Sequence, residues 1–148
     1  TVLIDHTNWD THYSNFSVLK DDLLPHLDSA MSTLFLDLHQ RGLLDDTLVL
    51  VTGEFGRTPR INKDAGRDHW GPSTAIAIGG GGIRGGNVVG ASDARAEKPA
   101  TEPWGPEDLA ATIYHVLGID PKTLFHTAEG RPIPIVPGTG RVIQPLFA

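Results

Sequence analysis

Cysteine is absent from the 148-residue sequence, so disulfide bonds, thiolate metal sites and cysteine nucleophiles are all excluded. Lysine and arginine are few, 12 residues against 18 aspartates and glutamates, and they form no cluster. Nucleic-acid binding relies on clustered cations, so we expect no nucleic-acid partner. No apolar run approaches the roughly 18 residues that a membrane-spanning helix needs, so we expect no transmembrane segment. No secretion signal is visible in these residues either.

Glycine and proline are abundant, with 17 and 11 residues, and make up about a fifth of the chain where about 12% is average. Apolar residues reach 39% of the sequence. Together these values predict a folded protein with long, well-defined loops rather than a disordered chain.

Short runs of β-branched and apolar residues predict strands. The run at 47–52 does not alternate between apolar and polar residues, which is typical of a strand buried on both faces. We expect strands at residues 1–4, 47–52, 74–78, 87–89 and 142–143.

Two helices are expected between these strands. Apolar residues recur at every third or fourth position from Phe16 to Leu38 and would form one apolar stripe. Pro25 should either kink this helix or open its second half. A second helix should begin at Pro106 and end near Leu117. Strands that alternate with helices predict an α/β fold with a mostly parallel sheet flanked by helices.

The chain shows no internal repeat and no second core, so we expect a single α/β domain over residues 1–148. The predicted sheet is small, and its first strand starts at the first residue. The chain therefore looks like part of a larger α/β domain.

Polar residues follow the predicted strands, where ligands collect in open α/β sheets. Asp10 and His12 are two positions apart and would share one side of an extended segment. A carboxylate and an imidazole on one side suit a zinc-like ion. The alternative is that Asp10 caps the following turn and His12 is a surface residue.

Asp68 and His69 form a second candidate pair. Adjacent residues of an extended chain point in opposite directions, so we expect only one of them to be a direct ligand. His69 is the stronger candidate, with Asp68 as a ligand or as the group that orients one. The alternative is a solvated loop.

Glu54 and Arg57 lie in a glycine-flanked turn after the strand at 47–52. The Glu54 carboxylate could bind a metal or act as a base, and the Arg57 guanidinium could hold a phosphate or sulfate group through two hydrogen bonds. The alternative is a structural pair between the two side chains.

Several short motifs occur in an order that resembles the C-terminal part of a bacterial family, the domain of unknown function 1501 family. This family is grouped with the alkaline phosphatase and sulfatase superfamily, whose fold is a large α/β sandwich. The motifs cover nearly the whole chain and are Trp9–His12, Gly53–Pro59, Gly66–Trp70, Pro106–Ile113, Leu117–Asp120 and Gly130–Pro132.

The resemblance implies metal-dependent hydrolysis of phosphate or sulfate esters. The metal would be divalent, with zinc expected first and manganese or calcium as other possibilities. Asp10, His12 and His69 resemble the metal ligands of the superfamily. Glu54 stands where many members carry the Asp of an Asp-His pair, and Phe55 stands where they carry the His. A phenyl ring cannot bind a metal, so a second metal site would be incomplete.

The implied partner is a small-molecule or polysaccharide ester. The nucleophile would belong to an N-terminal half that this chain lacks, so we expect the chain alone to be inactive. One alternative is a non-catalytic protein that binds an anion or a polysaccharide on the same scaffold, and another is that these residues are structural. The resemblance also implies a periplasmic or cell-envelope protein.

Overall fold

The structure is a computed structural model that describes residues 1–147 and shows a mixed α/β protein, as the sequence predicts. The helices are α1 (Asn15–Val18), α2 (Leu24–Gln40) and α3 (Pro106–Val116), and the strands are β1 (Val49–Val51), β2 (Gly56–Arg57), β3 (His69–Trp70), β4 (Ala77–Gly79), β5 (Leu124–His126) and β6 (Pro132–Pro134). Within residues 1–147, no helix combines the length and the apolar character needed to cross a membrane.

The chain divides into two compact units, each built from three segments. The first unit contains Thr1–Leu44, Val51–Ala77 and Ser92–Pro99. The second contains Asp45–Leu50, Ile78–Ala91 and the residues from Ala100 onward. The prediction of a single domain over 1–148 stays a prediction.

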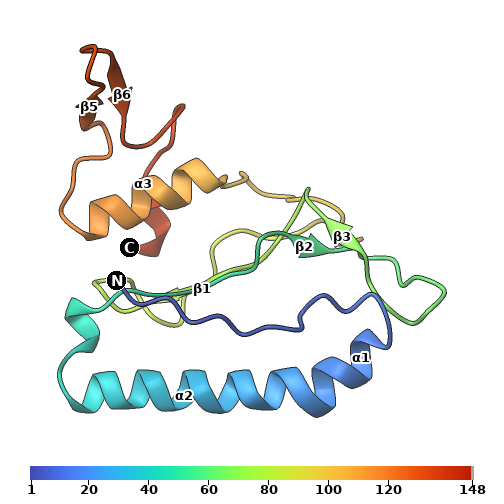
Figure 1. Ribbon diagram of the computed structural model, residues 1–148. Coiled ribbons are helices and arrows are strands. Elements are labelled where there is room, and N and C mark those ends of the chain that lie inside the picture. The colour runs from blue at the N-terminus through green and yellow to red at the C-terminus, as the bar shows by residue number, and fades with distance from the viewer. Residues whose placement is uncertain (148) are drawn as a thin grey trace. The chain divides into compact units, whose positions relative to one another are not determined.

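The long predicted helix is present in the first unit as two segments. α1 and α2 are joined by a π-helical turn at Leu19–Leu23, and the three follow one another as one rod (Figure 1). Pro25 is the second residue of α2 and so opens the second segment, where its missing N–H interrupts no bond within α2. α2 ends at Gln40, and Gly42, two residues later, adopts φ 68°.

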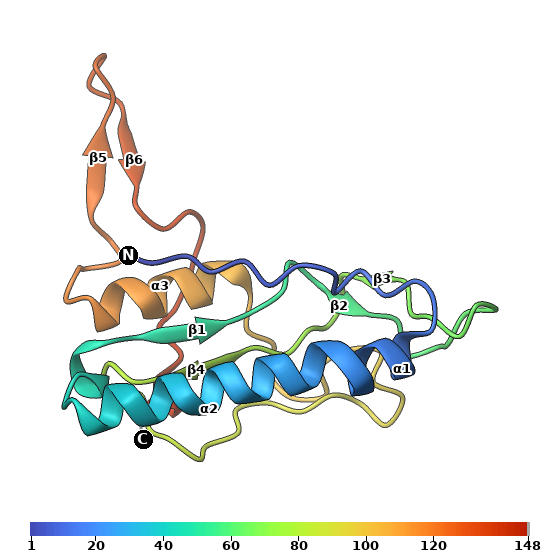
Figure 2. The same ribbon diagram turned by 60° about the horizontal axis from the view of Figure 1, so that its bottom comes forward.

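The sheets are small. β2 pairs with β3 in antiparallel orientation, β5 pairs with β6 in the same way, and β1 pairs with β4. In the second unit the β5–β6 hairpin stands away from α3 in both views (Figure 2). Strands of two or three residues do not show the mostly parallel sheet flanked by helices that the sequence predicts.

Two of the five predicted strands are present in shortened or shifted form. The run at 47–52 becomes β1, and the run at 74–78 becomes β4 at Ala77–Gly79. The strand predictions at 87–89 and 142–143 were wrong, since these residues form no strand.

The strand prediction at 1–4 was also wrong. These residues are extended but pair with no neighbour among residues 1–147, and Val2, Leu3 and Ile4 are 86%, 93% and 78% exposed. An apolar run becomes a strand only where another strand accepts its backbone hydrogen bonds and other side chains cover it.

The best-packed core lies in the second unit. Ile83, Ile143 and Leu146 are buried there. Half-buried apolar residues pack around them, namely Leu48, Ile78, Val89, Trp104, Val116 and Phe147. Ile143 thus contributes to the core from the position just before a 3-10 turn (Gln144–Leu146) rather than from a strand.

Candidate metal centre

Two segments of the first unit bring the candidate side chains together. Asp10 and His12 lie in a tight turn before α1, in which the backbone N–H of His12 donates to the carbonyl of Asp10 at 3.0 Å. His69 begins β3, and β2 places Arg57 directly opposite it. Asp68 precedes β3, and its carbonyl accepts a hydrogen bond from the N–H of Thr58 at 2.8 Å.

Three potential ligand atoms converge on one point. Nε2 of His69 lies 2.8 Å from Oδ1 of Asp10, and Nε2 of His12 lies 3.0 Å from the same oxygen. The two Nε2 atoms are 3.2 Å apart. Tetrahedral zinc ligands at about 2.0–2.1 Å from the ion are about 3.3–3.4 Å apart, so small outward shifts would let these atoms share one zinc ion. The donor set, two imidazoles and a carboxylate, therefore fits a divalent metal.

Asp68 lies behind His12. Its Oδ1 is 2.8 Å from Nδ1 of His12, and because a carboxylate only accepts, Nδ1 donates. A hydrogen on Nδ1 leaves Nε2 with its lone pair directed at Asp10 and His69. Asp68 therefore orients His12, while His69 points at the centre directly, one of the arrangements that the sequence left open.

Arg57 holds the turn that carries Asp10. Its Nη2 donates to Oδ1 of Asp10 at 2.6 Å and to the carbonyl of Trp9 at 3.0 Å. Its Nη1 donates to the carbonyl of Arg67 at 3.2 Å. Both terminal nitrogens are thus engaged within the protein, and the prediction that Arg57 clamps an anion stays a prediction.

The charges of the cluster favour ionised carboxylates. The hydrogen bond from Arg57, followed by the contact with His69, lowers the pKa of Asp10 from 3.8 to about 2. The hydrogen bond from His12 and then that from Asn62 lower the pKa of Asp68. Both carboxylates are therefore negative at neutral pH, as metal binding requires.

Sequence reasoning missed the loop that supports the cluster. Nη1 of Arg67 donates to the carbonyls of Thr58 and Pro59 at 2.6 and 2.7 Å, and its guanidinium lies 5.4 Å from the ring of Phe16. Gly66 is packed so closely that an added Cβ would collide with the backbone of His12. The glycine itself is the one sequence signal for such a close approach.

Of Glu54 and Phe55, only Phe55 has a contact with the cluster of Asp10, His12 and His69. Glu54 is exposed in the bend before β2. The ring of Phe55 packs on the ring of His69, with 4.3 Å between centroids and 40° between planes. Phe55 therefore covers one side of the His69 imidazole, and the predicted base or ligand role of Glu54 stays a prediction.

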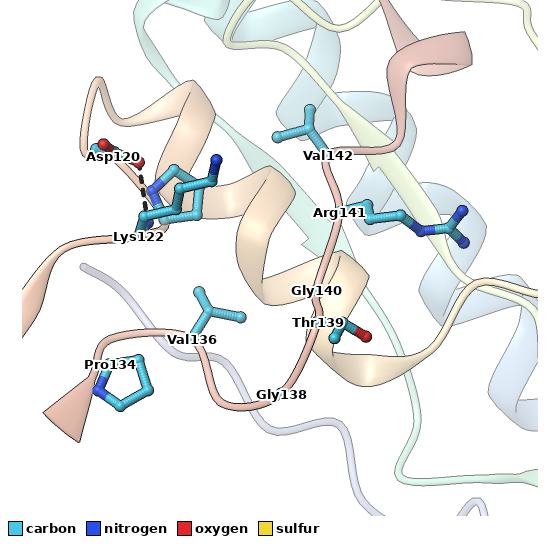
Figure 3. A pocket seen from close by; sticks show the side chains of 10 residues that line it. Asp120, Lys122, Pro134, Val136, Gly138, Thr139, Gly140, Arg141 and Val142 are labelled. Carbon is cyan, nitrogen blue, oxygen red and sulfur yellow. Dashed lines mark hydrogen bonds between the residues drawn. The ribbon is translucent and has the colours of Figure 1, made fainter.

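A shallow cavity of about 530 Å³ in the second unit is of another kind (Figure 3). Backbone and apolar side chains such as Val136 and Pro134 line much of it. The Asp120 carboxylate at its edge accepts from the N–H of Lys122 at 2.9 Å. Its lining contains no histidine, so it offers no comparable set of metal ligands.

Comparisons with curated proteins and with solved structures gave no match. One family model, described as "Protein of unknown function (DUF1501)", matches residues 1–147. The match covers nearly the whole chain, and the motifs at Asp10, Arg57 and His69 lie within it. The chain therefore belongs to the DUF1501 family.

Proposed function

We propose that this protein is a metal-dependent hydrolase of phosphate or sulfate esters whose divalent metal is bound by Asp10, His12 and His69. The convergence of Oδ1 of Asp10 with the two Nε2 atoms, at 2.8 to 3.2 Å from one another, carries the proposal. The resemblance of the sequence to the alkaline phosphatase and sulfatase superfamily supports the reaction class.

Electron repulsion is the physical reason for a cation at this point. Three atoms with lone pairs directed at one another repel unless a hydrogen or a cation lies among them. A hydrogen on Nε2 of His69 satisfies the contacts with both Asp10 and His12. A metal ion at the same point would satisfy all three atoms at once.

The ligand types favour zinc over calcium. Imidazole nitrogens suit zinc and other transition metals, whereas calcium prefers six to eight oxygen ligands. Three protein ligands also leave an open coordination position, as is typical of catalytic zinc. The exposure of His69 (50%) and Asp10 (65%) keeps this position accessible from solvent.

A divalent metal bound there would act as a Lewis acid and hold the anionic group of the ester. Asp68 would keep the Nε2 lone pair of His12 directed at the metal, and Arg57 would hold Asp10 in place. Glu54 would serve as a base or further ligand. The substrate would be a small-molecule or polysaccharide ester.

We further propose that the chain forms the C-terminal part of a larger α/β fold with a mostly parallel sheet flanked by helices. The nucleophile would come from the remainder of that fold. Among residues 1–147, the side chains of Asp10, His12, Asp68 and His69 form no hydrogen bond with a hydroxyl group. The Thr58 hydroxyl accepts from the backbone N–H of Asp68 and donates to the carbonyl of Arg60. The resemblance alone supports a periplasmic or cell-envelope location.

A non-catalytic protein that binds an anion or a polysaccharide is the second candidate. Phe55 favours it, because the resemblance puts this phenyl ring, which packs on His69, at the position where the superfamily carries a histidine ligand. This candidate retains a single metal but has no hydrolytic activity.

Metal content tests the proposal directly. The longest form of the protein that contains this sequence is saturated with zinc, manganese or calcium, desalted and subjected to elemental analysis. The wild type is compared with an Asp10→Ala/His12→Ala/His69→Ala variant. His26→Ala is the matched control, because His26 is an exposed histidine 3.5 Å from a single carboxylate, Asp22. Circular dichroism monitors folding.

We expect one zinc per chain in the wild type and in His26→Ala, and none in the folded triple variant. Absence of metal from the wild type after saturation would refute the proposal. Phosphate and sulfate monoesters are then offered to the metal-loaded protein. Hydrolysis that disappears in Asp10→Ala would exclude the binding-only candidate, and metal binding without hydrolysis would favour it.

A further inference from the structure

The side chain of Asn62 makes every hydrogen bond that an amide can make. Its Nδ2 donates to the carbonyl of His12 at 3.0 Å and to Oδ1 of Asp68 at 3.1 Å. Its Oδ1 accepts from the backbone N–H groups of Asp64 and Gly66, both at 2.9 Å. Two donors and two acceptor positions are therefore all used.

These partners also fix the direction of the amide. Both groups that face Nδ2 only accept, and both groups that face Oδ1 only donate. A flipped amide would lose all four hydrogen bonds, so a single orientation is compatible with the loop.

We propose that Asn62 is a positioning residue for the metal centre, which fixes Asp68 and the backbone of His12 so that Nε2 of His12 faces Asp10 and His69. The inference rests on the proposed function for its biological meaning, although the geometry itself involves no metal. Asn62 is the one side chain among residues 1–147 with hydrogen bonds to both Asp68 and the His12 backbone.

Three hydrogen bonds position His12, one on its ring, one on its backbone and one on Asp68. The His12 backbone is held through its carbonyl by Asn62, and the ring is held through Nδ1 by Asp68, which Asn62 also holds. Rotation of the ring about its two side-chain torsions would break the Nδ1 contact. Gly66 lies close to the His12 backbone, so the Asn62 side chain can accept from the N–H of Gly66 and donate to the carbonyl of His12 at the same time.

The test uses Asn62→Ser in the full chain. A serine hydroxyl can still accept from the N–H two residues ahead but cannot donate to both His12 and Asp68. Nitrogen NMR of the metal-free protein, at a pH where the imidazoles are neutral, reports which nitrogen of His12 carries the hydrogen, with His12→Gln assigning the signal. Zinc affinity is measured in parallel.

Asn87→Ser is the matched control. Asn87 also donates from Nδ2 to a backbone carbonyl, that of Pro145, at 2.7 Å, and it lies in the second unit. It should leave both the His12 signal and zinc affinity unchanged.

We expect the hydrogen on Nδ1 of His12 in the wild type and a mixture of both tautomers in Asn62→Ser. Zinc affinity should fall about 10- to 100-fold, the usual effect of losing a group that orients a ligand. Unchanged tautomer and affinity in a folded Asn62→Ser would overturn the inference.

Two further outcomes separate this inference from the proposed function. A wild type that binds no zinc but shows the tautomer change in Asn62→Ser would refute the metal centre and support the positioning role. If Asn62→Ser does not fold, Asn62→Asp keeps the oxygen that accepts from Asp64 and Gly66 while removing both donors. A wild-type His12 tautomer in Asn62→Asp would then overturn the inference.

Discussion

Arg57 determines the ionisation of Asp10. Its guanidinium donates to Oδ1 at 2.6 Å and, with the His69 contact, lowers the pKa of Asp10 to about 2. A carboxylate with a lowered pKa stabilises the fold above its ordinary pKa of 3.8, and this contribution is lost as the pH falls towards about 2. The cluster therefore keeps its Asp10 charge throughout the range from neutral pH down to about 4.

Arg57→Met should raise the pKa of Asp10 towards 3.8, because the largest cause of the lowering is removed. Carbonyl-carbon NMR of the Asp10 carboxyl against pH gives the midpoint directly. Arg60→Met is the control, since Arg60 is an exposed arginine of the neighbouring loop. A midpoint that stays near 2 in Arg57→Met would show that His69 alone holds the carboxylate.

Gly66→Ala should destabilise the first unit. The added methyl group would collide with the carbonyl and backbone of His12, and overpacking of this kind costs about 1–3 kcal/mol. Gly71→Ala in the same unit is the control, because an added Cβ there meets no atom within 4 Å. Urea unfolding measures both. Equal stability of the two variants would contradict the close approach at Gly66.

The residues of the centre differ in how far the sequence revealed them. Spacing paired Asp10 with His12, and the Asp68–His69 pair offered His69 as a separate candidate. The structure brings Asp10, His12 and His69 within hydrogen-bond distance of one another. Asn62 gave no such signal, and Arg67 stood in a family motif with no role assigned, because the roles of both depend on backbone carbonyls that only the folded loop brings near them. A hydrogen bond from a side chain to the backbone of a residue far away in the sequence produces no repeating pattern of residue types, so it cannot be predicted from periodicity.

At the scale of elements, α3 is fixed by its first turn. Asp108 is the third helical residue, and its carboxylate accepts from the N–H of Gly105 at 2.9 Å and from the N–H of Arg141 at 2.8 Å. Burial raises the pKa of Asp108, but these two backbone hydrogen bonds outweigh it and lower the pKa overall. One side chain thus caps the helix and fastens the C-terminal segment to it.

Asp108→Ala should lower the free energy of unfolding at neutral pH by about 1–2 kcal/mol, the usual cost of losing a helix cap. The difference from wild type should shrink as the pH falls below 3.8, because protonation removes the same interaction in the wild type. Glu107→Ala, one residue earlier and exposed, is the control. A difference that does not depend on pH would argue against a role for the carboxylate charge.

Both helices were predicted from the sequence, whereas only two of the five predicted strands are present, in shortened or shifted form. The apolar stripe that starts at Phe16 and the proline at 106 each predict a helix from residues of a single segment, and both helices are present. The strand prediction at 1–4 failed because a strand depends on a partner elsewhere in the chain. The β5–β6 hairpin was missed since prolines begin and end β6.

At the scale of the whole molecule, Val2–Ile4 is a run of three apolar residues whose side chains are almost fully exposed to solvent. Burial of apolar surface provides about 25 cal/mol per Å², and here that contribution is missing. Exposed apolar runs of this kind promote self-association.

Val2→Thr/Leu3→Lys/Ile4→Thr should reduce self-association without lowering the melting temperature, because the replaced side chains are exposed. Light scattering and thermal unfolding of the same samples provide the two measurements. The buried Leu23→Thr, with a side chain 2% exposed, is the contrasting variant and should melt earlier. A lower melting temperature in the triple variant would mean that residues 2–4 are covered in solution.

The Nε2 atoms of His12 and His69 differ in whether they carry a hydrogen, and this difference affects how readily each could bind a metal. Nε2 of His12 already presents a lone pair, because the imidazole hydrogen is on Nδ1, which donates it to Asp68 in a hydrogen bond. Nε2 of His69 carries the hydrogen that makes its 2.8 Å contact with Asp10, and this hydrogen must leave before the nitrogen can coordinate. If the proposed divalent metal binds here, Asp10 and His12 would offer ligand atoms as they stand, whereas His69 would do so only after its Nε2 hydrogen has moved, and a buffer base should accelerate that movement.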